Sequence, residues 1–146
     1  MLRDEVEVAL NELVDLAEAS AEAYARAAEL AGDSELIAMF RGLEERRREM
    51  AEEIRNHDRR LGDIPHAPDP DKSTARDLWA RFRAALAFNA GQELLASCEA
   101  AEEHLAQRMA SALDLPPPEA PAELIRHLQY EVVATVGRLA ALRARA

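Results

Sequence analysis

Apolar residues recur every three or four positions along four long stretches of the chain, the spacing that places them on one face of an α-helix. The stretches that we expect to be helical span about 4–31, 34–61, 91–113 and 121–144. A shorter stripe predicts a further helix over about 74–88. The pattern therefore predicts an all-α chain with four long helices and one short helix.

Glycine and proline mark the boundaries between these stretches. Gly32 is placed to end the first helix, and Asp33 or Ser34 to cap the second. Three prolines in residues 62–74 exclude a helix there, whereas Pro121 could open the last helix. A tight first turn, a long crossover and a proline-rich turn predict an antiparallel four-helix bundle in a single domain spanning 1–146. Its crossover, between the second and third long helices, would carry the short helix.

The inward stripe of the second predicted helix contains four apolar residues around one arginine: Phe40, Leu43, Arg47, Met50 and Ile54. An unpaired guanidinium in a core is untenable, so Arg47 must meet an anion or reach water along its stem. Glu102 is the one clear inward carboxylate at a similar height, on the third long helix. We therefore predict a buried or half-buried ion pair between Arg47 and Glu102. The alternative is that Arg47 reaches outward to Glu44 or to water.

Bundles of this connectivity can hold two metal ions at mid-height, using a Glu from each of two helices and a Glu-x-x-His pair from each of the others. The inward positions of this chain are mostly unsuited to that role: Ala17, Ser20, Arg47, Met50, Val132 and Thr135. One clear carboxylate cannot hold two ions, and an inward guanidinium repels a cation. We expect no metal and no other cofactor. The alternative is an unorthodox carboxylate site built from Glu44, Glu102 and Glu131.

Charge and cysteine usage limit the partners and the compartment. A net charge of −10 argues against nucleic acid as a partner. The basic run 46–48 is flanked by glutamates, so pairs such as Glu44 with Arg48 predict a solvated face. No apolar run approaches the roughly 18 residues of a membrane span, and the acidic start lacks the basic region of a signal peptide. Cys98, the single cysteine, fits a reducing compartment. These features predict a cytoplasmic protein without a membrane partner.

Other polar groups have weaker interpretations. His57 lies on the core stripe near the end of its helix, where a hydrogen-bonded core histidine is favoured over a metal ligand. His104 and His127 lie off their stripes and are expected to face water. Cys98 lies among apolar residues and is expected to be buried and unreactive. The acidic loop 62–71 leaves a weak divalent-ion site open.

Five stretches carry a resemblance that covers nearly the whole chain: LNELVDLAEASAEAYARAAE, MFRGLEERRREMAEEI, LWARFRAAL, LLASCEAAEEHLAQRM and DLPPPEAPAELIRHLQYEVV. On these stretches the chain resembles a ferritin-like family of small bacterial four-helix-bundle proteins, described as a domain of unknown function and distantly similar to rubrerythrin. The resemblance implies a ferritin-like bundle without an established activity.

Compared with rubrerythrin-type sequences, the phenylalanine before the second-helix Glu-x-x-His is similar to Phe40. On that register the glutamate and histidine positions hold Arg47 and Met50, and the first-helix glutamate position holds Ala17. Of the metal-ligand positions of such sequences, only the third-helix glutamate is kept, as Glu102. The departure puts ferroxidase, peroxidase and iron-storage roles in doubt. We expect a metal-free interaction or structural protein that is not an enzyme. The alternative is a metal-binding protein or an oxidoreductase with the unorthodox carboxylate site.

Two aromatic residues bear on association with other proteins. Tyr130 lies off the stripe of the last helix, and Trp79 belongs to the short predicted helix. Either both pack against the crossover, or they belong to a surface that docks another bundle. Because alanine-rich helix faces allow backbones to approach closely, we expect a homodimer, with any other protein partner unspecified.

Overall fold

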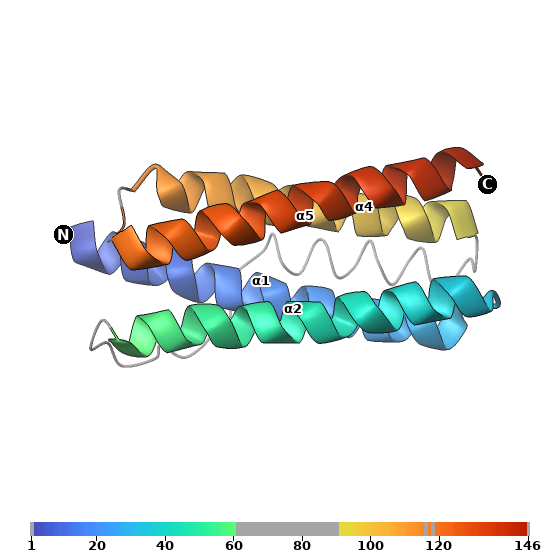
Figure 1. Ribbon diagram of the computed structural model, residues 1–146, viewed down its shortest axis with the longest axis horizontal. Helices are drawn as coiled ribbons and strands as arrows, with labels where there is room; N and C mark the ends of the chain where they lie inside the picture. The colour runs from blue at the N-terminus through green and yellow to red at the C-terminus, as the bar shows by residue number, and fades with distance from the viewer. Residues whose placement is uncertain (1, 61–90, 116, 118, 146) are drawn as a thin grey trace.

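The computed structural model describes residues 2–60, 91–115, 117 and 119–145 (Figure 1). Within these residues it contains four α-helices: α1 (Leu2–Leu30), α2 (Ser34–Arg60), α4 (Gly91–Leu113) and α5 (Glu119–Arg145). The predicted all-α class is confirmed, and the bounds of the long helices agree with those expected to within two residues. The short helix predicted at 74–88 lies outside the described residues. No described helix is long and apolar enough to cross a membrane.

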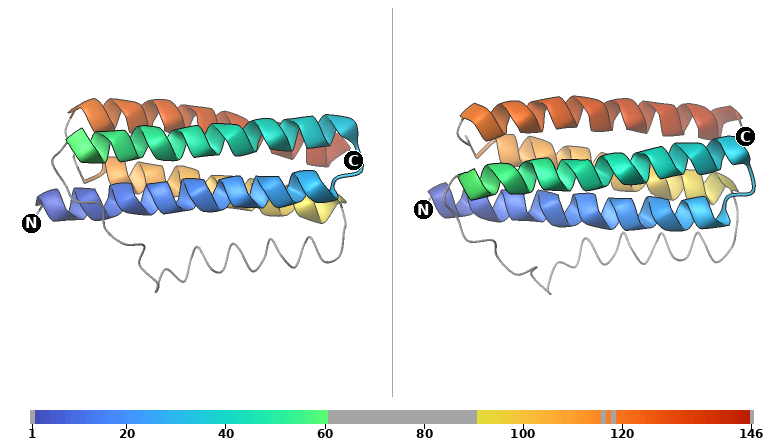
Figure 2. Two further views of the ribbon diagram at one scale, coloured as in Figure 1. Left: turned by 90° about the horizontal axis from the view of Figure 1, so that it is seen from below. Right: turned by 60° about the horizontal axis from the view of Figure 1, so that its bottom comes forward.

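The four helices pack as two antiparallel hairpins. α1 packs against α2, and α4 packs against α5, with neighbouring helices running in opposite directions (Figure 1). Contacts between α1 and α4, and fewer between α2 and α5, join the hairpins. The end of α2 and the start of α4 lie at opposite ends of the bundle (Figure 2). The chain between α2 and α4 therefore has to connect opposite ends.

Asp33 caps the turn that leads from α1 into α2. Its Oδ1 accepts a hydrogen bond from the backbone N–H of Glu35 at 2.8 Å, and its carbonyl accepts one from Ile37 at 2.9 Å. These bonds satisfy backbone donors that the first turn of a helix leaves without a partner. Of the two expected caps, Asp33 and Ser34, the structure selects Asp33.

The last helix begins earlier than the sequence indicated. α5 starts at Glu119, so Pro121 lies within its first turn rather than at its opening. Proline is tolerated there because the first backbone N–H groups of a helix have no intrahelical acceptor. Glu119 adds an acidic side chain at the positive end of the helix dipole, which is favourable.

The core consists of two apolar clusters that follow one another along the bundle. The first contains buried residues near the start of α1: Val6, Leu10, Leu13, Val14, Leu16 and Ala17, with Met50, Ala51, Ile54, Leu105, Met109, Ala112, Ile125, Leu128 and Val132 from the other helices. The second contains Ala23, Tyr24, Ala27, Ala28, Phe40, Leu43, Leu94, Leu95, Cys98 and Leu139. Four polar residues lie between the clusters, one on each helix, and form what we call the polar layer: Ser20, Arg47, Glu102 and Thr135.

Candidate functional site

The polar layer is organised by an ion pair between α2 and α4. Arg47 donates from Nε to Oε1 of Glu102 at 2.9 Å and from Nη2 to Oε2 at 2.5 Å. Both side chains are fully buried. The sequence predicted that these two residues would meet, and the structure brings them together in the two-point geometry that strengthens arginine–carboxylate pairs. The outward alternative, in which Arg47 reaches Glu44, is not the arrangement found.

Hydroxyl groups from the other two helices complete the site. Tyr24 donates its hydroxyl to Oε1 of Glu102 at 2.9 Å, and Ser20 donates to the same oxygen at 3.3 Å. Arg47 donates from Nη2 to the hydroxyl of Thr135 at 3.3 Å. Its Nη1 lies 3.5 Å from the sulfur of Met50. All four described helices therefore supply partners, and the buried charges are both paired and hydrogen-bonded.

The charge of Glu102 helps to keep three nearby groups protonated: Arg47, Tyr24 and Cys98. Burial lowers the pKa of Arg47, but the charge and hydrogen bonds of Glu102 outweigh that effect and the pKa is raised. Burial, together with the negative charge of Glu102, raises the pKa of Tyr24. The same two causes, burial first, raise the pKa of the Cys98 thiol. At neutral pH the site therefore holds one cation, one anion and neutral donors, without an activated thiolate or phenolate.

Sequence reasoning identified the two charges but not their supporting partners. Ser20 and Thr135 were recognised as inward positions, and nothing in their spacing assigned either of them, or Tyr24, to the pair. The feature of the sequence that could have identified them is chemical, since each carries a hydroxyl group at an inward position. Once a buried guanidinium and carboxylate are proposed, inward hydroxyls are the natural candidates for the remaining hydrogen bonds.

A second ion-pair cluster lies at the seam between α2 and α5. Arg46 donates from Nε and Nη2 to the two carboxylate oxygens of Glu131 at 2.5 and 3.1 Å. Its Nη1 donates to Glu53 at 2.8 Å and to Glu49 at 3.3 Å. Arg46 therefore bridges the seam at a half-buried position. The predicted solvated pairing of Glu44 with Arg48 is confirmed, at 3.1 Å.

The Arg46–Glu131 pair predicts a specific dependence of stability on pH. Burial raises the pKa of Glu131, but the hydrogen bond and charge of Arg46 outweigh it, and the net pKa lies below the ordinary value of 4.5. A lowered pKa in the folded state means that the unfolded state binds the proton more readily, so stability is lost as pH falls through and below 4.5. We expect Glu131→Gln to reduce the loss of unfolding free energy between neutral and acidic pH. Urea unfolding at pH 7 and at pH 4 measures this loss; equal losses in the variant and the native protein would contradict the prediction.

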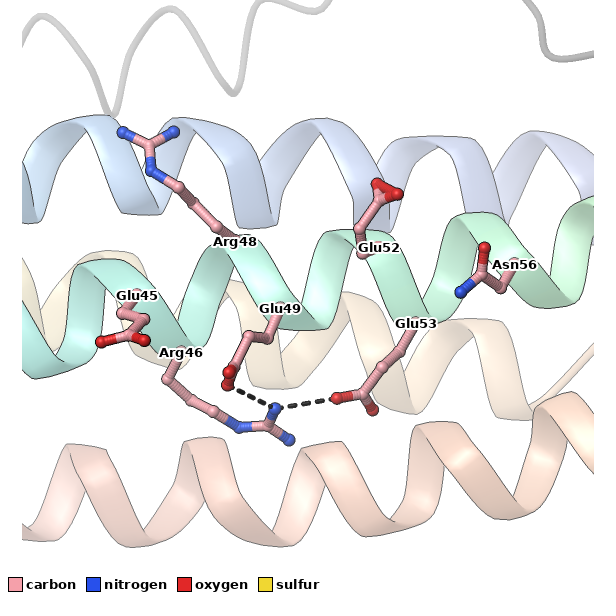
Figure 3. Close-up of a pocket in the computed structure, with 7 residues that line it drawn as sticks. All are labelled: Glu45, Arg46, Arg48, Glu49, Glu52, Glu53 and Asn56. Atoms are coloured by element: carbon pink, nitrogen blue, oxygen red, sulfur yellow. Dashed lines mark hydrogen bonds and ion pairs between the residues drawn. The ribbon is translucent and has the colours of Figure 1, made fainter.

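A shallow hollow lies on the outer side of α2, and all of the residues lining it come from that helix (Figure 3): Glu45, Arg46, Arg48, Glu49, Glu52, Glu53 and Asn56. Arg46 spans its floor through the bonds to Glu49 and Glu53 (Figure 3). The hollow is open to solvent and its arginines are already paired within the chain. All of its lining residues are charged or polar, whereas a typical small-molecule site is lined mainly by hydrophobic and aromatic residues.

The structure does not assemble the alternative carboxylate site. Its three members pair with separate arginines and share none: Glu44 with Arg41 and Arg48, Glu102 with Arg47, and Glu131 with Arg46. Within the described ranges no group of three His, Cys, Asp or Glu side chains could hold a metal ion. At mid-height α2 presents Arg47 and Met50, and α1 presents Ala17. This donor set does not fit a di-metal centre, since the one carboxylate of the layer is already neutralised.

The remaining sequence candidates have simple environments. His57 is half-buried rather than part of the core, and His127 is exposed as expected. His104, expected in water, is half-buried, and its pKa is lowered by burial and by the charge of Arg108. Cys98 is buried as expected. The possible ion site at 62–71 lies outside the described residues.

A family model described as "Domain of unknown function (DUF2383)" matches residues 5–115. The match includes nearly all of α1 and the whole of α2 and α4, and ends before α5 begins. It therefore contains both charges of the buried pair, whereas Thr135 lies beyond it. The comparisons with curated proteins and with solved structures give no match.

Proposed function

The chain belongs to the DUF2383 family, and we propose that it is a ferritin-like four-helix bundle that works through protein interactions rather than catalysis. We propose that the Arg47–Glu102 pair occupies the part of the core in which metal-binding bundles of this type hold their ions. Support for the ferritin-like arrangement comes from the four antiparallel helices and from the opposite ends that residues 61–90 have to connect. A long connection between the second and third long helices is typical of such bundles.

The buried pair carries the proposal. A fixed guanidinium at the centre of the bundle repels any cation that approaches Glu102, and its charge cannot be removed by deprotonation. Arg47 also already occupies both oxygens of that carboxylate. A metal ion would therefore have to displace a buried arginine and leave it without a partner. We infer that the interior serves to hold the bundle together.

The chemistry of the described residues favours a non-enzymatic role. The raised pKa values of Tyr24 and Cys98 hold both groups in forms that are poor nucleophiles and poor bases. The hollow on α2 is lined by paired charges on a single helix. We therefore propose that the outer helix faces carry the function. A net charge of −10 makes another protein a better partner than nucleic acid, and we propose that the chain acts in the cytoplasm.

Metal analysis tests this proposal. We expect protein purified from cells grown with added iron and manganese to contain well under one metal ion per chain, because the donor set is incomplete and opposed by Arg47. Elemental analysis measures the content directly, and thermal unfolding with Fe²⁺, Mn²⁺ or Zn²⁺ should give the same midpoint as with chelator. Two tightly bound ions per chain, or a midpoint that rises with metal in the way ligand binding requires, would overturn the proposal.

A further inference from the structure

The outward face of α5 is unusually apolar for a surface helix. Tyr130 is 80% exposed and Val133 is 54% exposed, and they are two of the four large hydrophobic residues that stand out on the described surface. Small exposed residues continue the face toward the end of the helix. We call this surface the α5 face: Tyr130, Val133, Ala134, Gly137, Ala141 and Ala144. At 100° per residue, Tyr130 lies opposite the buried Leu139, so the face points directly away from the core.

The outer face of α2 provides the contrast within the same bundle. Between residues 41 and 56 its exposed residues other than Gly42 are all charged or polar: Arg41, Glu45, Arg48, Glu49, Glu52 and Asn56. A helix that faces water on one side normally carries such residues there. Between Tyr130 and Ala144, by contrast, Arg138 is the one exposed charge. Among the described helices α5 contacts α4 and α2, and neither covers its outward face.

We propose that the α5 face binds the same face of a second copy of the chain; this inference rests on the proposal that the protein works through interactions. Two copies that each carry −10 repel one another, so their contact has to avoid the acidic surfaces. α1 carries eight acidic residues and two arginines, whereas α5 carries three acidic residues and four arginines. α5 is therefore the one described helix with an excess of positive charge, and it brings an exposed tyrosine of the kind that anchors interfaces.

The charges along α5 select an antiparallel arrangement. The exposed Glu119, Glu123 and Arg126 lie near its start, with the acids in excess, and the exposed Arg138 lies near its end. A parallel pair would place each glutamate and each arginine beside the same residue of the second copy, which is repulsive. An antiparallel pair, with its two-fold axis near residue 132, places Glu123 within reach of Arg138 of the second copy. The Tyr130 ring then packs over Ala134 and Gly137 of that copy.

Gly137 suits this contact because the space above it is open. A Cβ atom at Gly137 would meet no other atom of the chain within 4 Å. The absence of a side chain lets a neighbouring helix approach closely, and the interaxial distance between packed helices depends on the size of the residues in contact. In the proposed pair the tyrosine of one copy fills the space left by the glycine and alanine of the other. The same contact occurs twice, as a two-fold interface requires.

Matched charge substitutions test the location of the interface. Sedimentation equilibrium should give the native protein twice its chain mass of 16.2 kDa. Val133→Glu should return the mass to that of one chain, while circular dichroism shows unchanged helix content because the position is exposed. Val8→Glu, at a residue 60% exposed on α1, is the matched control and should remain a dimer. A native monomer at every concentration, or a dimer that survives Val133→Glu, would overturn the inference.

Crosslinking tests the orientation. In a Cys98→Ala background, Ala134→Cys should couple two chains through a short bismaleimide linker, because residue 134 lies near the proposed axis. Ala141→Cys should not, since the two positions lie about 27 Å apart along an antiparallel pair. A parallel pair would couple at both positions, and that result would overturn the antiparallel arrangement. Metal content is measured separately, so the metal-free proposal and this interface can fail independently.

Discussion

Glu102→Ala is expected to lower the free energy of unfolding by about 3–5 kcal/mol, because it leaves the guanidinium of Arg47 buried without its anion. Arg47 has no exposed surface, and its remaining partners are Thr135 and the sulfur of Met50. Neither is charged. Tyr24 and Ser20 lose their acceptor in the same variant. Urea unfolding followed by circular dichroism measures the change.

Two further variants separate the loss of a partner from the value of the pair itself. Glu44→Ala removes ion pairs with exposed arginines and should change stability by no more than about 1 kcal/mol. The joint change Arg47→Met, Glu102→Leu removes both charges and should be far milder than Glu102→Ala, because attraction within a buried pair roughly balances its desolvation. A joint variant as unstable as Glu102→Ala would show that the pair contributes large net stability and would contradict this account.

Phe40→Ala is expected to cost about 3–5 kcal/mol, the range for truncating a buried phenylalanine. Phe40 is fully buried in the second apolar cluster, and its ring stacks with that of Tyr24 at a centroid distance of 6.0 Å. The variant removes this contact and leaves a cavity beside the ring that bonds Glu102. Thermal and urea unfolding measure the loss.

Leu30→Ala is the control for Phe40→Ala. Leu30 is 46% exposed at the end of α1, so its truncation should change the free energy of unfolding by only about 0.5 kcal/mol or less. Similar losses in the two variants would mean that the second cluster does not depend on Phe40 in the way that its burial indicates.

The helices could be predicted from local periodicity, and the central pair from periodicity together with the cost of an unpaired buried charge. The three-and-four spacing located the four long helices, and it placed Arg47 among Phe40, Leu43, Met50 and Ile54. A guanidinium on a core stripe needs an anion, and Glu102 was the clear inward carboxylate at that height. Burial and charge together therefore left little choice of partner.

The parts that could not be predicted depend on distances between helices. The basic run 46–48 was expected to form a solvated face, but Arg46 is half-buried and reaches Glu131 on α5 as well as Glu49 on its own helix. Periodicity places a residue at an angle around one axis but does not give the separation of two axes, which decides whether an arginine can bridge a seam. Periodicity likewise could not show that Glu44, Glu102 and Glu131 stay apart. In the structure they form no common site, because each carboxylate pairs with its own arginines.

The polar layer also limits how the helices can be aligned with one another. A slide of α4 by one turn, about 5.4 Å, would carry Glu102 out of reach of Arg47 and into one of the two apolar clusters. Such a slide exchanges similar aliphatic contacts elsewhere along the bundle, so apolar packing alone would resist it weakly. Leaving the charges of Arg47 and Glu102 buried without partners would resist it strongly. We therefore expect the pair to act as an alignment key: without it, the joint Arg47→Met, Glu102→Leu chain should sample shifted helix registers, visible as added heterogeneity in its amide NMR spectrum.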